Sequence, residues 1–173
     1  MAKSIRKLDG LIPSALHAEL QKIRGDILQV AAGTVSHADA SAAIATANAT
    51  DLPTSIVLTN AIKVAYNAHL ASACDTTSGQ GVHRAADATN PTAVANATDL
   101  ASVQTLLNDL KSKYNSHRAL ASAHGAVDAT NVSAAAAATD QGTSNTLAND
   151  LKTQMNAHFA RALNHSAIAL VAP

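Results

Sequence analysis

Histidine is the side chain whose number and spacing in this sequence could support chemistry. Imidazole nitrogens bind transition metals and exchange protons near neutral pH. Two neighbouring repeat units place histidines seven residues apart, which on a helix is one face and a separation of about 10 Å. Two such histidines cannot share an ion unless a neighbouring helix contributes. Seven of the eight histidines fall at two repeated positions, His37, His83, His124 and His165 at one and His69, His117 and His158 at the other.

A second spacing, His-x-x-x-Asp, joins His83 to Asp87 and His124 to Asp128. The pattern could indicate a metal site or an acid–base pair, but Ser41 stands at the aspartate position of the first unit. We favour a local role, in which the aspartate forms a turn and the histidine bonds carbonyls at a helix end. We therefore expect no bound metal or cofactor. The candidates if a metal does bind are His83, Asp87, His117, His124, Asp128, His158 and His165.

Motifs typical of enzymes do not occur in the sequence. It contains no glycine-rich phosphate loop, no Gly-x-Ser-x-Gly elbow and no Cys-x-x-Cys pair. We therefore predict that the protein is not an enzyme, has no catalytic residues and takes no small-molecule substrate.

The histidines belong to an internal repeat. Residues 105–117 recur at 146–158 and, more loosely, at 57–69, with the shared pattern Leu-x-Asn-x-(Leu/Ile)-Lys-x-x-(Tyr/Met)-Asn-x-His. Its apolar positions alternate steps of three and four residues, which indicates one face of an α-helix. The predicted packing and interaction residues are Leu106, Asn108, Leu110, Tyr114, Asn115, His117, Leu147, Asn149, Leu151, Met155, Asn156 and His158.

The repeat predicts an all-α fold of four long helices, built from units of about 41 residues and arranged as a bundle or short array. We expect short helical or extended returns, and favour short helices at 91–97 and 132–138. The returns could cap antiparallel hairpins or run back alongside a long helix, and we favour antiparallel neighbours. The long helices are expected at about 14–33, 51–73, 98–123 and 139–165, with a loop insertion at 74–81. The corresponding organisation is an arm at 1–13, units at 14–50, 51–97, 98–138 and 139–165, and an apolar tail at 166–173.

Composition predicts a thin core. Leu, Ile, Val and Phe make up only about 21% of the 173 residues, near the level below which chains stay disordered. We therefore expect partner subunits to supply part of the stability, in a symmetric homo-oligomer. The formal net charge of zero argues against nucleic acid as the main partner. The basic arm could be a solvated helix start or dock on an acidic neighbour, and the tail could pack on its own bundle or on another chain.

The sequence shows no secretion signal or membrane span. Asp9 and Pro13 interrupt the apolar part of the N-terminal segment, so we expect no signal peptide. No apolar run approaches the ~18 residues of a spanning helix. Cys74 is the single cysteine, so the fold does not depend on a disulfide.

The repeat resembles those of structural proteins of tailed bacteriophages. The resemblance is carried by Lys-x-x-Tyr-Asn-x-His at 111–117, His-x-x-x-Asp-x-Thr-Asn at 83–90 and Ala-Thr-Asp-Leu at 97–100. It implies a virion component of head decoration, neck or tail, made in the host cytoplasm and packed against itself and other virion proteins. The alternative is a histidine-using metal-binding helical protein. A third possibility, an ice-binding helix, lacks the regular 11-residue threonine spacing.

One substitution distinguishes packing from metal binding. Val30 occupies, in the first unit, the position that His117 occupies in the third. We therefore expect His117→Leu to be tolerated, provided that it leaves no buried partner unpaired.

Overall fold

The chain divides into two units, Met1–Val35 and Ser36–Pro173, and a computed structural model describes residues of the second. The described residues are 39, 42–72, 83, 86–121, 123–124 and 127–161. The predicted basic arm, first helix, loop around Cys74 and apolar tail lie outside them, as do His37 and His165.

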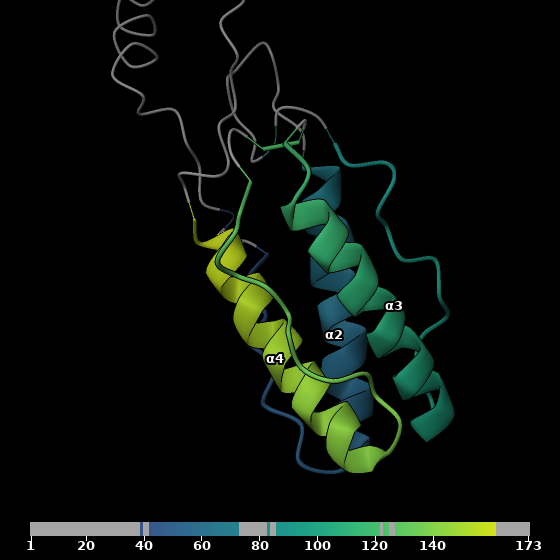
Figure 1. Ribbon diagram of the computed structural model, residues 1–173. Coiled ribbons are helices and arrows are strands. Elements are labelled where there is room, and N and C mark those ends of the chain that lie inside the picture. The colour runs from purple at the N-terminus through teal and green to yellow at the C-terminus, as the bar shows by residue number, and fades with distance from the viewer. Residues whose placement is uncertain are drawn as a thin grey trace, which may run out of the picture. The chain divides into compact units, whose positions relative to one another are not determined.

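The regular structure of the described residues is α-helical, and no β-strand occurs among them. The three helices are α2 (Leu52–Ala71), α3 (Leu100–Arg118) and α4 (Gln141–Phe159) (Figure 1). The all-α class predicted from periodicity is confirmed. In the part of the chain that is described, no helix is long and apolar enough to cross a membrane.

The three helices begin in the same way. Asp51, Asp99 and Asp140 are the N-caps, and each forms a capping box with the residue three positions later. The carboxylate accepts from a backbone N–H that has no partner within the helix, which is why Ala-Thr-Asp recurs at every helix start. The helix ends were predicted less well. α3 stops at Arg118 rather than at 123, because Leu120 N–H bonds the carbonyl of His117 in a tighter turn.

The helices run parallel, so the expectation of antiparallel neighbours is wrong. Each helix packs on the other two, and His69, His117 and His158 from the three C-terminal turns meet at one end. Near the opposite end, Ser55 Oγ of α2 lies 2.6 Å from Asn145 Oδ1 of α4. Parallel neighbours need a connection that travels the length of a helix. A 19-residue helix is about 28 Å long, which a fully extended connection of 22 residues (119–140) easily spans.

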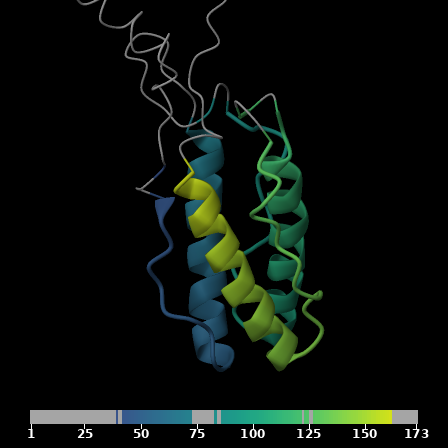
Figure 2. The same ribbon diagram turned by 60° about the vertical axis from the view of Figure 1, so that its left-hand side comes forward.

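These connections are extended, and the short helices predicted at 91–97 and 132–138 do not form. Figures 1 and 2 show the extended segments running back along the helices. Asparagine side chains take the place of the missing intrahelical bonds. Asn108 of α3 accepts from Ala138 N–H at 2.9 Å and donates to its carbonyl at 3.1 Å. A helix at 132–138 would have used the Ala138 N–H in its own hydrogen bonding.

The asparagine contact occurs three times and closes the bundle into a ring. Asn60 of α2 holds Ala97 in the segment before α3, and Asn149 of α4 holds Ala49 in the segment before α2. Together with Asn108 and Ala138, each helix therefore binds the segment that leads into the next helix. A second set of asparagines makes the same two backbone bonds: Asn67 with Thr92, Asn115 with Ser133, and Asn156 with Ile44. A set of lysines donates to backbone carbonyls of the same segments: Lys63 to Val94, Lys111 to Ala135, and Lys152 to Thr46.

The core lies between the three helices. Tyr66 and Tyr114 pack edge to face, with ring centroids 6.5 Å apart, and each donates its hydroxyl proton to a carbonyl of the adjacent extended segment. Of the predicted packing residues, Leu106, Leu110, Tyr114, His117, Leu147, Leu151, Met155 and His158 are buried, and Asn108, Asn115, Asn149 and Asn156 are half-buried. The apolar positions of the repeat thus fill the centre, and its amides line the rim.

Candidate metal centre

Three histidines meet where the parallel helices end. His69, His117 and His158 each lie in the last turn of their helix and have no solvent exposure. Their ring centroids are 5.2, 5.3 and 5.5 Å apart, which is a nearly equilateral triangle. Two histidines seven residues apart on one helix cannot bind the same ion without a ligand from a neighbouring helix. In the parallel arrangement, two neighbouring helices each supply a histidine.

An aspartate orients each ring of this triangle. The Nδ1 atoms of His69, His117 and His158 lie 2.9 Å from carboxylate oxygens of Asp39, Asp87 and Asp128, in every case thirty residues earlier. An ionised carboxylate only accepts, so each Nδ1 carries the proton. In the neutral form of a ring held in this way, Nε2 carries the lone pair. Carboxylate–histidine pairs of this kind orient many metal ligands in proteins.

The aspartates are themselves fixed by turns. Asp87 Oδ1 accepts from the backbone N–H groups of Thr89 and Asn90, and its Oδ2 accepts from the Asn90 amide at 2.6 Å. Burial alone would raise the pKa of Asp87, but the hydrogen bonds from Asn90, Thr89 and His117 outweigh it and hold the pKa well below its usual range. Asp128 has the same arrangement with Thr130 and Asn131. Both carboxylates are consequently charged at neutral pH.

Two further histidines lie against the triangle. His83 Nδ1 donates to the Ser72 carbonyl at 3.0 Å, and His124 Nδ1 donates to the Leu120 carbonyl at 3.1 Å. The His83 ring centroid is 4.4 Å from that of His69, and the His124 centroid is 4.6 Å from that of His117. Because carbonyls only accept, Nδ1 carries the proton in both neutral rings and the lone pair is on Nε2.

The bonds of His83 and His124 to backbone carbonyls agree with the local role favoured for the His-x-x-x-Asp spacing. His124 bonds a carbonyl just beyond the end of α3, while Asp128 forms a turn. That interpretation omits the longer-range bond from each aspartate to a helix histidine. The candidates His83, Asp87, His117, His124, Asp128 and His158 all belong to this cluster, and His165 lies outside the described residues.

Burial favours the neutral form of His83, His117 and His124. It lowers the pKa of His83 and of His124 to about 4, in each case more than the hydrogen-bonded carbonyl and nearby aspartates raise it. Burial also lowers the pKa of His117, and the neighbouring His69 and His124 lower it further. Neutral imidazole is the form that binds metals.

The lone-pair nitrogens point at one another. His69 Nε2 and His83 Nε2 are 3.1 Å apart, and His117 Nε2 is buried with no hydrogen-bond partner among the described residues. One ligand nitrogen from each of His69, His117, His124 and His158 falls within a set whose members all lie within 4.8 Å of one another. Such a set of imidazole nitrogens can hold a transition-metal ion.

Two members of the cluster were not among the sequence candidates. Asp39 was missed because aligning the first unit on His37 put Ser41 opposite Asp87, whereas the structure puts Asp39 there. His69 was assigned to the repeat but not to a site. The constant thirty-residue interval from aspartate to helix histidine would have identified both residues.

No protein-family model, curated protein or solved structure matches the chain.

Proposed function

We propose that the protein is a non-enzymatic structural component of a tailed-bacteriophage particle, in its head decoration, neck or tail. The repeat texture at 83–90, 97–100 and 111–117 supports the virion assignment. The proposal also includes four repeat units, the first of which has a long helix near 14–33, outside the described residues. The protein is made in the host cytoplasm and located in the virion.

The closed ring of side-chain-to-backbone bonds is the observation that carries a structural role. Asparagines and lysines of each helix bond the backbone of the next extended segment. These polar side chains therefore hold the fold together rather than line a ligand site. The aspartate–histidine pairs resemble catalytic dyads in their contacts. Their imidazoles have no solvent exposure, which supports a role other than turnover of a substrate.

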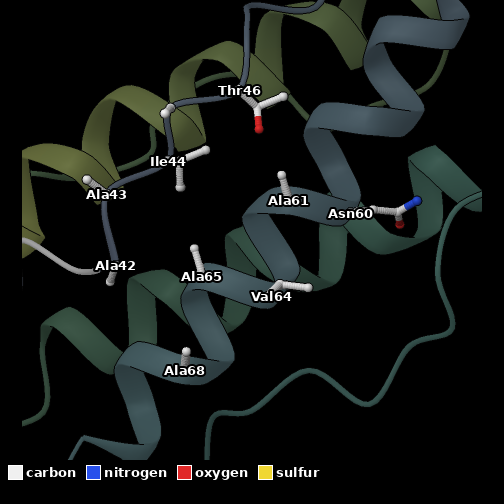
Figure 3. Close-up of a pocket in the computed structure, with 10 residues that line it drawn as sticks. Ala42, Ala43, Ile44, Thr46, Asn60, Ala61, Val64, Ala65 and Ala68 are labelled. Atoms are coloured by element: carbon white, nitrogen blue, oxygen red, sulfur yellow. The ribbon is translucent and has the colours of Figure 1, made fainter.

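The outer face of α2 supports assembly with a second copy or another structural protein. Val57 and Val64 are 59% and 67% exposed, and both lie on this face. The equivalent positions are Thr105 and Ser112 in α3 and Thr146 and Thr153 in α4. Beside Val64, an open groove of about 500 Å³ runs between α2 and the segment 42–46, lined mainly by alanines and Ile44 (Figure 3). Only one of three equivalent faces is thus apolar, as expected of a contact surface.

Sedimentation of the full chain over a range of concentrations tests this proposal. We expect a self-associating species that Val64→Lys dissociates, while the matched change Ser112→Lys on α3 leaves it intact. Immunolabelling of purified particles in the electron microscope tests the virion assignment. A chain that stays monomeric and does not label particles would refute the proposal.

A further inference from the structure

The five imidazoles form the densest group of ligand-type side chains in the described part of the chain. Packing alone explains why the rings are buried, but not why their lone pairs converge. Nδ1 of each of the five rings faces an oxygen that can only accept, either a carboxylate of Asp39, Asp87 or Asp128 or a carbonyl of Ser72 or Leu120. In the neutral form of each ring, the lone pair therefore lies on Nε2.

One buried nitrogen of the cluster lacks a hydrogen-bond partner. His117 Nε2 is a buried acceptor with no partner among the described residues, and leaving such a group unsatisfied is costly. In the same cluster, His69 Nε2 and His83 Nε2 lie 3.1 Å apart. A cation bound by His117 Nε2 and by neighbouring ring nitrogens would satisfy this group.

The hydrogen bonds around Asp87 point in the same direction. Asp87 is buried, and turn residues Thr89 and Asn90 fix the carboxylate that binds His117 Nδ1. In carboxylate–histidine–zinc triads the carboxylate orients the ring in this way, and the other ring nitrogen binds the ion. His117 Nε2 is therefore placed as a metal ligand would be.

The nitrogen separations are near those in the ligand shell of such an ion. Four nitrogens at 2.0–2.1 Å from a tetrahedral metal are about 3.3 Å from one another. The observed 3.1 Å between His69 and His83 is close to this value. The nitrogens of His69, His117, His124 and His158 all lie within 4.8 Å of one another, so inward shifts of about 1 Å would bring them to bonding distance.

We propose that the end of the three-helix bundle holds one divalent first-row transition-metal ion, bound by Nε2 of His69, His117 and His158 with His124 and His83 completing the shell. The donor set is all imidazole, which selects ions such as Zn²⁺, Co²⁺ and Ni²⁺ over Mg²⁺ and Ca²⁺. The ion joins the C-terminal turns of α2, α3 and α4 to the residues that follow α2 and α3. Its role is structural, because the ligands are buried.

Metal content and Co²⁺ spectroscopy of the full chain test the site. The protein is stripped with chelator and then titrated with Co²⁺ or Zn²⁺, with Mg²⁺ as the negative control. We expect one Co²⁺ or Zn²⁺ per chain, visible d–d absorption from bound Co²⁺, and a melting temperature that falls on chelation and recovers with Zn²⁺ or Co²⁺ but not with Mg²⁺. X-ray absorption of the Zn²⁺ form should show imidazole nitrogens at about 2.0–2.1 Å.

Variants show whether the cluster is the site. His124→Gln removes a ligand outside the helices and should weaken Co²⁺ binding at least about tenfold, and His117→Gln should abolish it. His17→Gln, a histidine outside the repeated positions, should have no effect. If His117→Gln fails to fold, His124→Gln and the X-ray absorption spectrum still decide. Sub-stoichiometric uptake, a chelator-insensitive melting temperature, or binding unchanged in His124→Gln would overturn the proposal and leave a proton-linked imidazole cluster.

Discussion

Nδ1 of His117 donates a hydrogen bond of 2.9 Å to Oδ2 of Asp87, thirty residues earlier in the chain, and both side chains are buried. The pair joins the end of α3 to the start of the extended segment that precedes it. The same relationship holds for His69 with Asp39 and His158 with Asp128. An aspartate–histidine bond therefore joins the end of each helix to the start of the extended segment that precedes it. An asparagine of each helix binds the segment that leads into the next helix.

His117→Leu should destabilise the protein, contrary to the tolerance expected from the sequence alone. Leucine leaves the Asp87 carboxylate buried without its imidazole partner, which costs about 3 kcal/mol in the free energy of unfolding. Urea denaturation of the metal-free protein measures the loss. In a double-mutant cycle, His117→Leu and Asp87→Ala should couple by about 1–3 kcal/mol. The control Asp109→Ala, on the same helix but bonded to Thr92, should be nearly additive with His117→Leu.

Replacing a ring-closing asparagine should be costly at every equivalent position. Asn108→Leu leaves the N–H and the carbonyl of buried Ala138 unpaired, with an expected loss of about 2–4 kcal/mol. Asn149→Leu should cost a similar amount, because it releases Ala49 in the same way. Thr105→Leu on the exposed side of α3 should change stability by less than about 0.5 kcal/mol. An Asn149→Leu variant as stable as the unmodified protein would show that the ring is open between α4 and α2.

Acid should destabilise the metal-free protein within a defined window. The pKa values of buried His83 and His124 are lowered to about 4, whereas an exposed imidazole has a pKa near 6.5. Between about pH 6.5 and pH 4 the unfolded chain therefore binds more protons than the folded one. The free energy of unfolding should fall through this window by about 1 kcal/mol per pH unit for each histidine, and these two residues contribute no further loss below it.

Chemical denaturation at several pH values, with chelator present, measures this slope. His124→Gln should reduce it, because one of the groups that binds extra protons on unfolding is removed. Below about pH 4 a second loss should begin, since the hydrogen bonds that lower the pKa of Asp87 and Asp128 require ionised carboxylates. A stability that stays constant from pH 6.5 to pH 4 would contradict the burial of neutral imidazoles.

Local rules predicted the helices, but not their arrangement. The three-four spacing of apolar residues indicated α3 and α4, and residues such as Leu106, Leu110 and Met155 lie in the core. The direction of the helices depends on whether 86–99 and 127–140 turn or run back. That choice is decided by Asn60 and Asn108, whose amides bond backbone groups thirty or more residues away. Propensity and periodicity carry no information about such contacts.

The histidine cluster could not be predicted from the sequence for the same reason. Each helix contributes one ring, so the triangle of His69, His117 and His158 exists only once three parallel helices are assembled. The sequence located the repeated histidines and identified the turn-forming role of Asp87 and Asp128. It could not assign Asp39, because the insertion near residue 74 and the degenerate first unit obscured the register. The thirty-residue interval shared by all three pairs restores it.

A cross-link between the first turns of α2 and α4 tests the parallel, closed arrangement directly. Ser55 Oγ and Asn145 Oδ1 are 2.6 Å apart although ninety residues separate them. In a Cys74→Ser background, Ser55→Cys with Asn145→Cys should form an intramolecular bridge, by oxidation or with a short thiol-specific cross-linker. Closing a loop of this length should raise the free energy of unfolding by up to about 4 kcal/mol where the geometry is unstrained.

The matched control pairs Ser55→Cys with Thr153→Cys, nearer the C-terminal end of α4. An antiparallel α4 would bring that end toward Ser55, whereas the parallel arrangement keeps the two thiols apart. Mass spectrometry of the cleaved protein identifies the bridge, and gel filtration confirms that it lies within one chain. Bridging by the Thr153→Cys pair rather than the Asn145→Cys pair would reverse the direction of α4. The asparagine ring and the histidine triangle would then both fail, because each requires the three helices to end together.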